Sequence, residues 1–105
     1  MKHFPIFLAV AGKRIVVSGG GEAALAKLRL LLKTEARISV FAKAANADIH
    51  RLAVMGKLTL INRALDHGDV NSAALFYAAN EDAAEDARTA AIATAEGALV
   101  NIVDN

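Results

Sequence analysis

The sequence lacks cysteine and tryptophan and contains a single proline, and each scarcity narrows what the chain can be. Without cysteine, disulfide bonds and thiolate metal sites are excluded, which suits a reducing compartment and predicts a cytoplasmic protein. The proline, Pro5, interrupts the apolar run near the start of the chain. That run is too short to span a membrane, and only Lys2 precedes it where a signal peptide carries its positive charge. We therefore expect no membrane partner.

The chain also has no large excess of positive or of negative charge. Twelve basic residues stand against eleven acidic ones, so the net charge is only +1. No basic stripe is available to neutralise a phosphate backbone, and we expect no nucleic-acid partner. The histidines His3, His50 and His67 show no metal-ligand spacing, and we expect no metal site. Asp66 and Asp69 flank His67 in a stretch whose composition is typical of a solvated loop.

What the chain does contain is a regular alternation of apolar runs and helical patterns over 105 residues, enough for one domain with a small core. Strands are expected at 13–19, 37–42, 57–63, 74–79 and 98–103, helices at 21–36, 45–56 and 81–96, and a loop or short helix at 65–73. This order predicts an α/β fold, a Rossmann-like doubly wound parallel sheet of about five strands with helices on both faces. Residues 1–105 are expected to form a single dinucleotide-binding domain.

Three consecutive glycines, Gly19, Gly20 and Gly21, separate the first expected strand from the first expected helix. Together with Ala24 they fit the G-x-G-x-x-G/A fingerprint of dinucleotide-binding folds, in the required strand–turn–helix context. Gly19 would form the tight turn, Gly21 would let the backbone approach a pyrophosphate, and Ala24 would allow close packing on the sheet. N–H groups at the start of the helix would then bind the anion. The alternative is a glycine-rich tight turn that binds nothing.

The fingerprint usually continues with an acid about 20 residues further on, which binds the ribose 2′-hydroxyl. Here Ala42 and Lys43 stand at that place. Lys43 would meet a ribose hydroxyl or a 2′-phosphate, or would simply be a solvated lysine after a strand. These residues leave the choice between NAD and NADP open.

Two further residues follow strands at the edge where ligands bind in such sheets. Asn80 is interpreted either as the N-cap of the alanine-rich helix or as a residue bordering the cofactor, and both roles are compatible. Asp104 follows the last expected strand, where a carboxylate would accept a proton while a hydride leaves to a nicotinamide. On pattern alone, an ordinary acid near a chain end is the simpler reading of Asp104.

The opening FPIFLAVAGKRIVVSGGG and the following EAALAKLRLLL resemble the N-terminal NAD-binding domain of siroheme synthases, the precorrin-2 dehydrogenase and sirohydrochlorin ferrochelatase family. The matching residues there are Pro5-Ile6-Phe7, Gly19-Gly20-Gly21, Ala24, Lys27 and Leu30-Leu31-Leu32. Later, residues 78–82 resemble the family's Ala-Ala-Thr-Asp-Asp segment, and residues 101–104 resemble its Asn-Val-Val-Asp segment. These landmarks run in family order along essentially the whole chain.

The resemblance implies NAD-dependent oxidation of precorrin-2 to sirohydrochlorin in sirohaem biosynthesis, with iron insertion as a second activity of the complete protein. The partner would then be a tetrapyrrole substrate. Asp104 aligns with the family aspartate assigned to catalysis. Glu22 and Ala23 align with NAD-contacting positions, and so do Lys43 and Ala44.

The chain departs from the family pattern in three respects. Ala26 stands where the family usually has arginine, Asn80 replaces threonine, and the family's dimerisation and C-terminal helical regions are absent. Those regions build the tetrapyrrole cleft, so the alternative function is an isolated NAD(P)-binding module without catalytic activity of its own. A fold whose cofactor site has decayed is disfavoured by the glycines. An exposed edge strand leaves a homodimer open.

Overall fold

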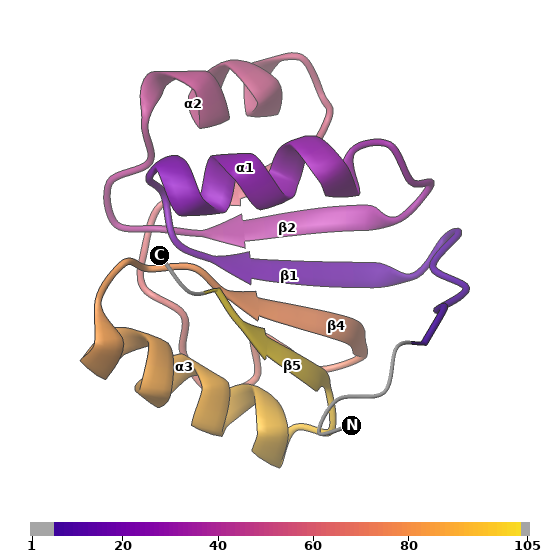
Figure 1. Cartoon of the computed structure of the whole chain (residues 1–105). Coiled ribbons are helices and arrows are strands. Elements are labelled where there is room, and N and C mark those ends of the chain that lie inside the picture. Colours follow the sequence, from indigo (N-terminus) through magenta and orange to yellow (C-terminus); the bar gives the residue numbers. More distant parts are fainter. Residues whose placement is uncertain (1–5, 104–105) are drawn as a thin grey trace.

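The computed structural model describes residues 6–103, which form five strands and three helices in the predicted order (Figure 1). The strands are β1 (Arg14–Ser18), β2 (Arg37–Phe41), β3 (Thr59–Ile61), β4 (Ala73–Ala78) and β5 (Leu99–Ile102). The helices are α1 (Glu22–Leu31), α2 (Ala47–Val54) and α3 (Ala83–Ala95).

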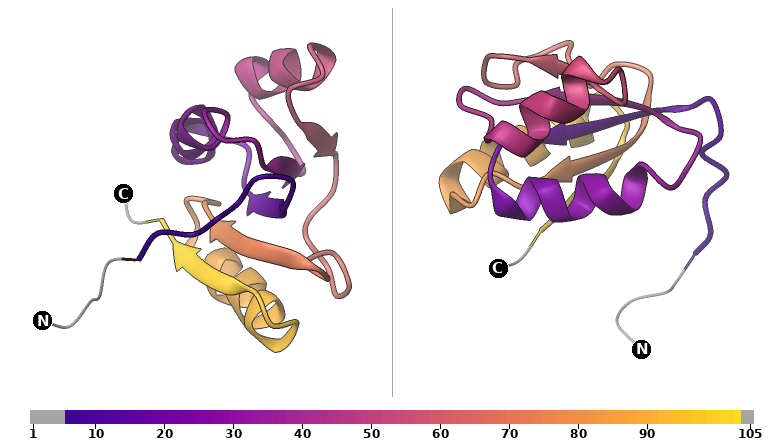
Figure 2. Two further views of the ribbon diagram at one scale, coloured as in Figure 1. Left: turned by 90° about the vertical axis from the view of Figure 1, so that its right-hand side faces the viewer. Right: turned by 90° about the horizontal axis from the view of Figure 1, so that it is seen from above.

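The five strands form one parallel sheet in the order β3-β2-β1-β4-β5. Helices α1 and α2 cover one face of this sheet and α3 covers the other, as Figures 1 and 2 show from different sides. The predicted doubly wound α/β fold is therefore confirmed, and β3 stands at one edge of the sheet. From β1 the chain passes through α1 to the neighbouring strand β2. It reaches β4, the neighbour on the other side of β1, only after β3.

The central strand β1 is apolar from Ile15 to Val17 because helices cover both of its faces. Ile15 and Val17 pack with Leu25 and Leu28 of α1 in one core cluster. Val16, between them in sequence, points to the other face and joins a second cluster with residues of β4 and α3. Ile15, Val16 and Val17 are fully buried in these clusters, so β1 and its carboxyl end are held rigidly.

All three helices are shorter than predicted, and the segment at 65–73, predicted as a loop or short helix, is a loop. The first helix ends at Leu31 rather than at residue 36, because the chain turns there and the Thr34 hydroxyl donates a hydrogen bond to the Leu31 carbonyl at 2.6 Å. The segment at 65–73 contains no helix. It is a turn whose Asp69 carboxylate accepts two hydrogen bonds from Arg63, at 2.7 and 2.8 Å.

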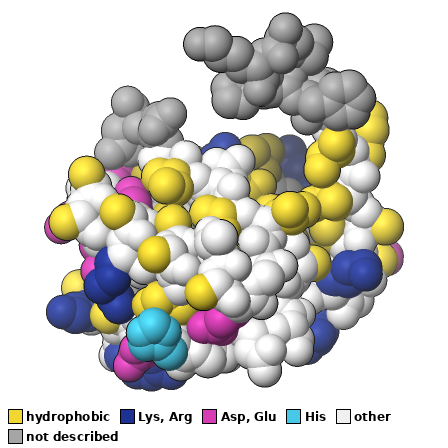
Figure 3. Space-filling view, turned by 90° about the horizontal axis from the view of Figure 1, so that it is seen from below, with side chains coloured by type: hydrophobic (Ala, Val, Ile, Leu, Met, Phe, Trp, Pro, Cys, Tyr) yellow, Lys and Arg dark blue, Asp and Glu magenta, His cyan; other side chains and the backbone are white. Residues whose placement is uncertain are grey.

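The surface of the described residues carries both signs of charge. On the face shown in Figure 3, basic and acidic side chains are interspersed and neither sign forms an extended field. His50, on α2, is exposed. Among residues 6–103, no helix is both long enough and apolar enough to cross a membrane.

Candidate functional site

The candidate site lies at the carboxyl edge of the sheet, next to the end of β1. β1 pairs with β2 on one side and with β4 on the other, and the helices that follow β1 and β4 cover opposite faces. Such a point, where successive connections diverge, is where open parallel sheets bind their ligands. The loops after β1, β2 and β4 meet there.

The turn after β1 requires glycine at its first position for two reasons. Gly19 has a φ of +137°, which L side chains rarely adopt. A Cβ at Gly19 would also lie 2.0 Å from the backbone oxygen of Ala79, at the end of β4. The ends of β1 and β4 are therefore in direct backbone contact, which draws the edges of the site together.

The second glycine allows an equally close approach on the β2 side. A Cβ at Gly20 would lie 2.7 Å from the Cα of Ala45 and 2.8 Å from the carbonyl oxygen of Ala44. The carbonyl of Gly20 accepts a hydrogen bond from the N–H of Asn46 at 2.8 Å. The loops after β1 and β2 are thus joined, and neither glycine position leaves room for a side chain.

Helix α1 begins directly after these glycines and has no cap of its own. Gly21 occupies the N-cap position, where no side chain is available to accept from the first turn. Within residues 6–103, the N–H groups of Gly20, Gly21 and Glu22 form no hydrogen bond. The N–H of Ala23 donates to the Glu81 carboxylate at 2.8 Å. Open N–H groups at the positive end of a helix form a ready anion-binding site.

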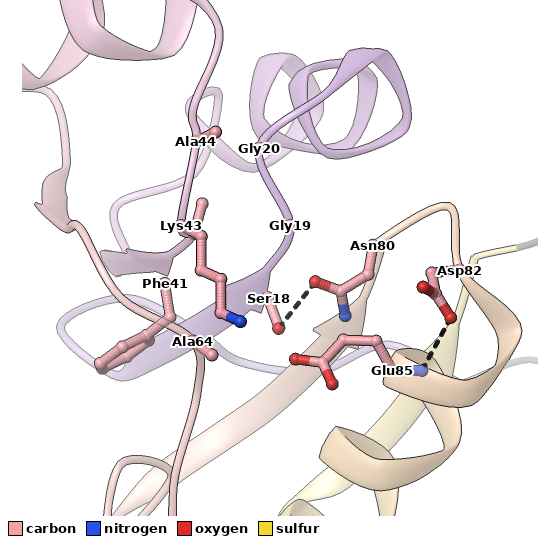
Figure 4. A pocket seen from close by; sticks show the side chains of 11 residues that line it. Ser18, Gly19, Gly20, Phe41, Lys43, Ala44, Ala64, Asn80, Asp82 and Glu85 are labelled. Atoms are coloured by element: carbon pink, nitrogen blue, oxygen red, sulfur yellow. Dashed lines mark hydrogen bonds between the residues drawn. The ribbon is translucent and has the colours of Figure 1, made fainter.

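Beside this turn lies a pocket of about 330 Å³. It is lined by Ser18, Gly19, Gly20, Phe41, Ala42, Lys43, Ala44, Ala64, Asn80, Asp82 and Glu85. Figure 4 shows the Lys43 side chain reaching into it, with its amino group toward Ser18 and Glu85. The pocket therefore combines one ammonium group with two carboxylates, those of Asp82 and Glu85.

Asn80 is held at the rim of this pocket by hydrogen bonds to residues of β1 and α3. The Ser18 hydroxyl donates to the Asn80 side-chain oxygen at 3.1 Å. The Asn80 amide nitrogen, in turn, donates to the buried Asp86 carboxylate at 3.0 Å. The interpretation of Asn80 as a helix cap is wrong, because Asp82 caps α3 by accepting from the N–H groups of Ala84 and Glu85. A cap needs the position just before the helix, and α3 begins two residues later than expected.

Glu85 is held ionised at the pocket wall. A two-pronged hydrogen bond from Arg88, at 2.7 and 2.8 Å, lowers the pKa of the Glu85 carboxyl, and the positive charges of Arg88 and Lys43 act in the same direction. Arg88 also donates to the Leu65 carbonyl at 2.7 Å, which fixes the loop after β3 to α3. The carboxylate is therefore both charged and firmly placed.

The residues predicted for the site fall into three groups. Five of them line the pocket: Gly19, Gly20, Lys43, Ala44 and Asn80. Three others stand at the start of α1 next to it: Gly21, Glu22 and Ala23. Asp104, the predicted catalytic residue, lies outside the described residues.

Four polar or charged residues of the site were not predicted: Ser18, Glu81, Asp82 and Glu85. Ser18 directly follows the apolar run of β1, and Asp82 precedes a helical pattern, so both positions could be recognised from the sequence. Glu81 and Glu85 carried none, because their roles depend on contacts between the turn after β4 and other parts of the chain.

Basic residues also gather at the opposite, amino edge of the sheet, around hollows of about 460 and 470 Å³. There Arg14 donates to the carbonyls of Asp69 and Asn71, and Arg37 donates to that of Gly12. These guanidinium groups are used to hold loops together. Residues 6–103 contain no group of three or more His, Asp or Glu side chains placed to hold a metal ion.

The parallel fold, the glycine turn and the open N–H groups at the start of α1 define the class of the chain as an α/β domain built for a dinucleotide. A family model described as "Putative NAD(P)-binding" matches residues 6–105. The chain belongs to this NAD(P)-binding family.

The curated relatives are considerably longer proteins. A siroheme synthase of Pseudoalteromonas atlantica is 38% identical over 105 residues, which are 100% of this chain and 23% of that protein. A siroheme synthase of Nitrosococcus oceani is 33% identical over 104 residues, 99% of this chain and 22% of the relative. The chain thus spans less than a quarter of the length of these two relatives.

A solved structure called SirC, precorrin-2 dehydrogenase, shares the fold. It superposes on this chain with a TM-score of 0.82 at 24% sequence identity. The match covers 94% of this chain and 48% of the SirC chain. At that identity the likeness establishes the architecture, which is the expected Rossmann-like one.

Proposed function

We propose that the chain binds NAD across the carboxyl edge of its sheet and that, within a longer protein, it serves the NAD-dependent oxidation of precorrin-2 to sirohydrochlorin. One observation carries the binding proposal. Three N–H groups at the start of α1, those of Gly20, Gly21 and Glu22, form no hydrogen bond within residues 6–103. Donors in this arrangement suit a pyrophosphate. The family match supports the cofactor, and the siroheme synthase relatives support the substrate.

The pocket favours NAD over NADP as the dinucleotide. Lys43 contributes one positive charge near the end of β2, whereas Asp82 and Glu85 contribute two negative ones. Because Glu85 is kept ionised by Arg88, a 2′-phosphate placed here would meet a net negative surface. Ribose hydroxyls, by contrast, donate well to carboxylates. Asn80, fixed by Ser18 and Asp86, would border the same ligand.

NAD supplies a hydride acceptor when it is bound. Oxidation of the tetrapyrrole also releases a proton, and Asp104 is our proposed acceptor for it. The proposal is supported by Val103, the residue before Asp104, whose N–H donates to the Ala78 carbonyl at the end of β4. Iron insertion in the complete protein, a cytoplasmic location and a homodimer belong to the same proposal.

Calorimetric titration of the purified chain with NAD and NADP tests the binding step. We expect heat from NAD, weaker binding of NADP, and NAD binding weakened about 10- to 100-fold in Gly21→Asp. Equal affinity for both nucleotides would overturn the assignment to NAD. The oxidation is tested in a longer protein that includes this chain, where Asp104→Asn should keep NAD binding and lose turnover of precorrin-2.

A second candidate function is an NAD(P)-binding module without catalysis. It is favoured by the family model, whose description names NAD(P) binding and no reaction. Binding of NAD without oxidation of precorrin-2, even when the remaining parts of a relative are supplied, would select this candidate.

A further inference from the structure

Glu81 lies in the turn between β4 and α3 but makes its contact elsewhere. Its carboxylate accepts the Ala23 N–H at 2.8 Å, across 58 residues of sequence. The other carboxylate oxygen is the atom nearest to the position that a Cβ of Gly21 would take, at 3.0 Å. The carboxylate thus sits against the first turn of α1, where a local N-cap side chain is missing.

This placement is not needed to begin α3. That helix is capped by Asp82, which accepts from the N–H groups of Ala84 and Glu85 at 3.0 and 3.1 Å. Glu81 instead adopts a left-handed backbone with a φ of +58°, a conformation that costs about 1–2 kcal/mol for a residue with a side chain. The turn thereby directs a negative charge away from its own helix and toward α1.

A carboxylate and a pyrophosphate compete for the same place at a helix start. Both are drawn to the positive end of α1, and both need its N–H groups as donors. The Ala23 N–H can satisfy only one of them fully, and two anions in contact repel each other. Glu81 is exposed, so its side chain can move into water when the donors are taken.

We propose that Glu81 is an internal anion that occupies part of the pyrophosphate position in the empty site and is displaced when NAD binds. This inference rests on the proposed NAD site. Glu81 then acts in two opposite ways. It stabilises the start of α1 in the absence of ligand, and it weakens the affinity for any ligand that brings a pyrophosphate.

Two substitutions separate these effects. Glu81→Gln keeps an acceptor for the Ala23 N–H and removes the charge, whereas Glu81→Ala removes both. We expect both variants to bind NAD about two- to five-fold more tightly, the size of a helix-end charge effect, with Glu81→Ala at least as tight as Glu81→Gln. ADP, which contains the pyrophosphate, should gain similarly. Adenosine, which lacks it, should bind unchanged.

Glu35→Gln is the matched control, because Glu35 is an exposed acid near the far end of α1 and outside the pocket. It makes the same change in net charge at the other edge of the sheet and should leave NAD affinity unaltered. Thermal unfolding should show a lower midpoint for Glu81→Ala without ligand, since α1 then loses its only described cap.

The outcomes distinguish this inference from the function on which it rests. If the unchanged chain binds NAD and Glu81→Gln binds it equally or more weakly, the displacement of Glu81 is overturned and the NAD site stands. If adenosine gains as much as NAD, the effect does not act through the pyrophosphate, and the inference fails again. If neither the unchanged chain nor any Glu81 variant binds NAD, both proposals fall together.

Discussion

The starts of α1 and α3 lie at the same edge of the sheet, yet they are built in different ways. Helix α3 begins with Asp82, whose side chain accepts from two N–H groups of the first turn. Helix α2, beside α1, is also capped locally, by Asn46. Helix α1 begins with a glycine and receives a carboxylate from 58 residues away.

The difference teaches which helix start serves stability and which serves binding. A local side-chain cap occupies the donors permanently and contributes about 1 kcal/mol to folding. A glycine at the N-cap gives up most of that contribution but leaves the donors open to a ligand. The carboxylate of Glu81 restores part of the capping in a form that can be displaced. The predictions below test this contrast, beginning with the largest expected effect.

Disrupting the glycine turn after β1 should remove the difference between the starts of α1 and α3. Gly19→Ala would place a Cβ 2.0 Å from the Ala79 oxygen in a backbone with positive φ, so β1 and β4 can no longer end side by side. We expect a loss of more than about 3 kcal/mol in unfolding free energy, measured by chemical denaturation. Gly12→Ala is the control, because Gly12 also has positive φ but open space around it, and should cost only about 1–2 kcal/mol. Equal losses would show that the contact with Ala79 is unimportant.

Giving α1 a local cap should turn it into a helix like α3. Gly21 has a φ of −102°, which any residue adopts, and aspartate is a strong N-cap residue. Gly21→Asp should therefore stay folded while its carboxylate takes the donors and repels both Glu81 and a pyrophosphate. We expect NAD binding to weaken about 10- to 100-fold in calorimetry, the range for losing a charged hydrogen bond. Undiminished affinity in a folded variant would place the pyrophosphate elsewhere.

Removing a purely structural cap should change stability alone. Asn46→Ala deletes the side chain that accepts the Ile49 N–H at 3.0 Å at the start of α2. We expect the variant to lose about 1 kcal/mol in denaturant unfolding, with no tightening of NAD binding. Glu81→Ala is the counterpart that should do both. If Asn46→Ala also tightened NAD binding, the separation between structural and ligand-binding helix starts would be wrong.

The contrast also explains how far the sequence could predict this molecule. The strands and their order were predictable because buried parallel strands are continuous apolar runs, as in β1. The glycines indicated the site, because glycine is the only residue type that the backbone contacts observed at Gly19 and Gly20 admit. The end of α1 at Leu31 and the cap of α3 were missed because they depend on side-chain hydrogen bonds of Thr34 and Asp82.

Glu81 lay beyond prediction from sequence for a different reason. A glutamate before a helix ordinarily serves that helix, through its charge or as a cap. Here the left-handed backbone of Glu81 turns it toward α1, and only the packing of β1 beside β4 brings the two turns together. Pairing across such a sequence separation leaves no local pattern.

The smallest expected effect concerns the charges that support α3. Arg88 lowers the pKa of Glu85 from its ordinary value of 4.5 in the folded chain. A lowered folded-state pKa stabilises the fold above the unfolded value, and that stabilisation is lost as the pH falls through the folded-state pKa. Arg88→Met removes this contribution. Its deficit in melting temperature should therefore be full near neutral pH and shrink as the pH falls below 4.5, the ordinary pKa of the carboxyl.

A residual deficit should remain at acid pH, because Arg88 also donates to the Leu65 carbonyl in a bond that does not titrate there. Melting curves of both proteins across this pH range provide the measurement, with Arg29→Met as the control. Arg29 is an exposed arginine in the last turn of α1 with no described acidic partner, so its deficit should not follow the titration of Glu85. A deficit in Arg88→Met that stays constant with pH would mean that the loop contact, and not the pairing with Glu85, is what Arg88 contributes to α3. The charge of Glu85 would then contribute nothing to the stability of α3, and Glu85 would act only as part of the pocket wall.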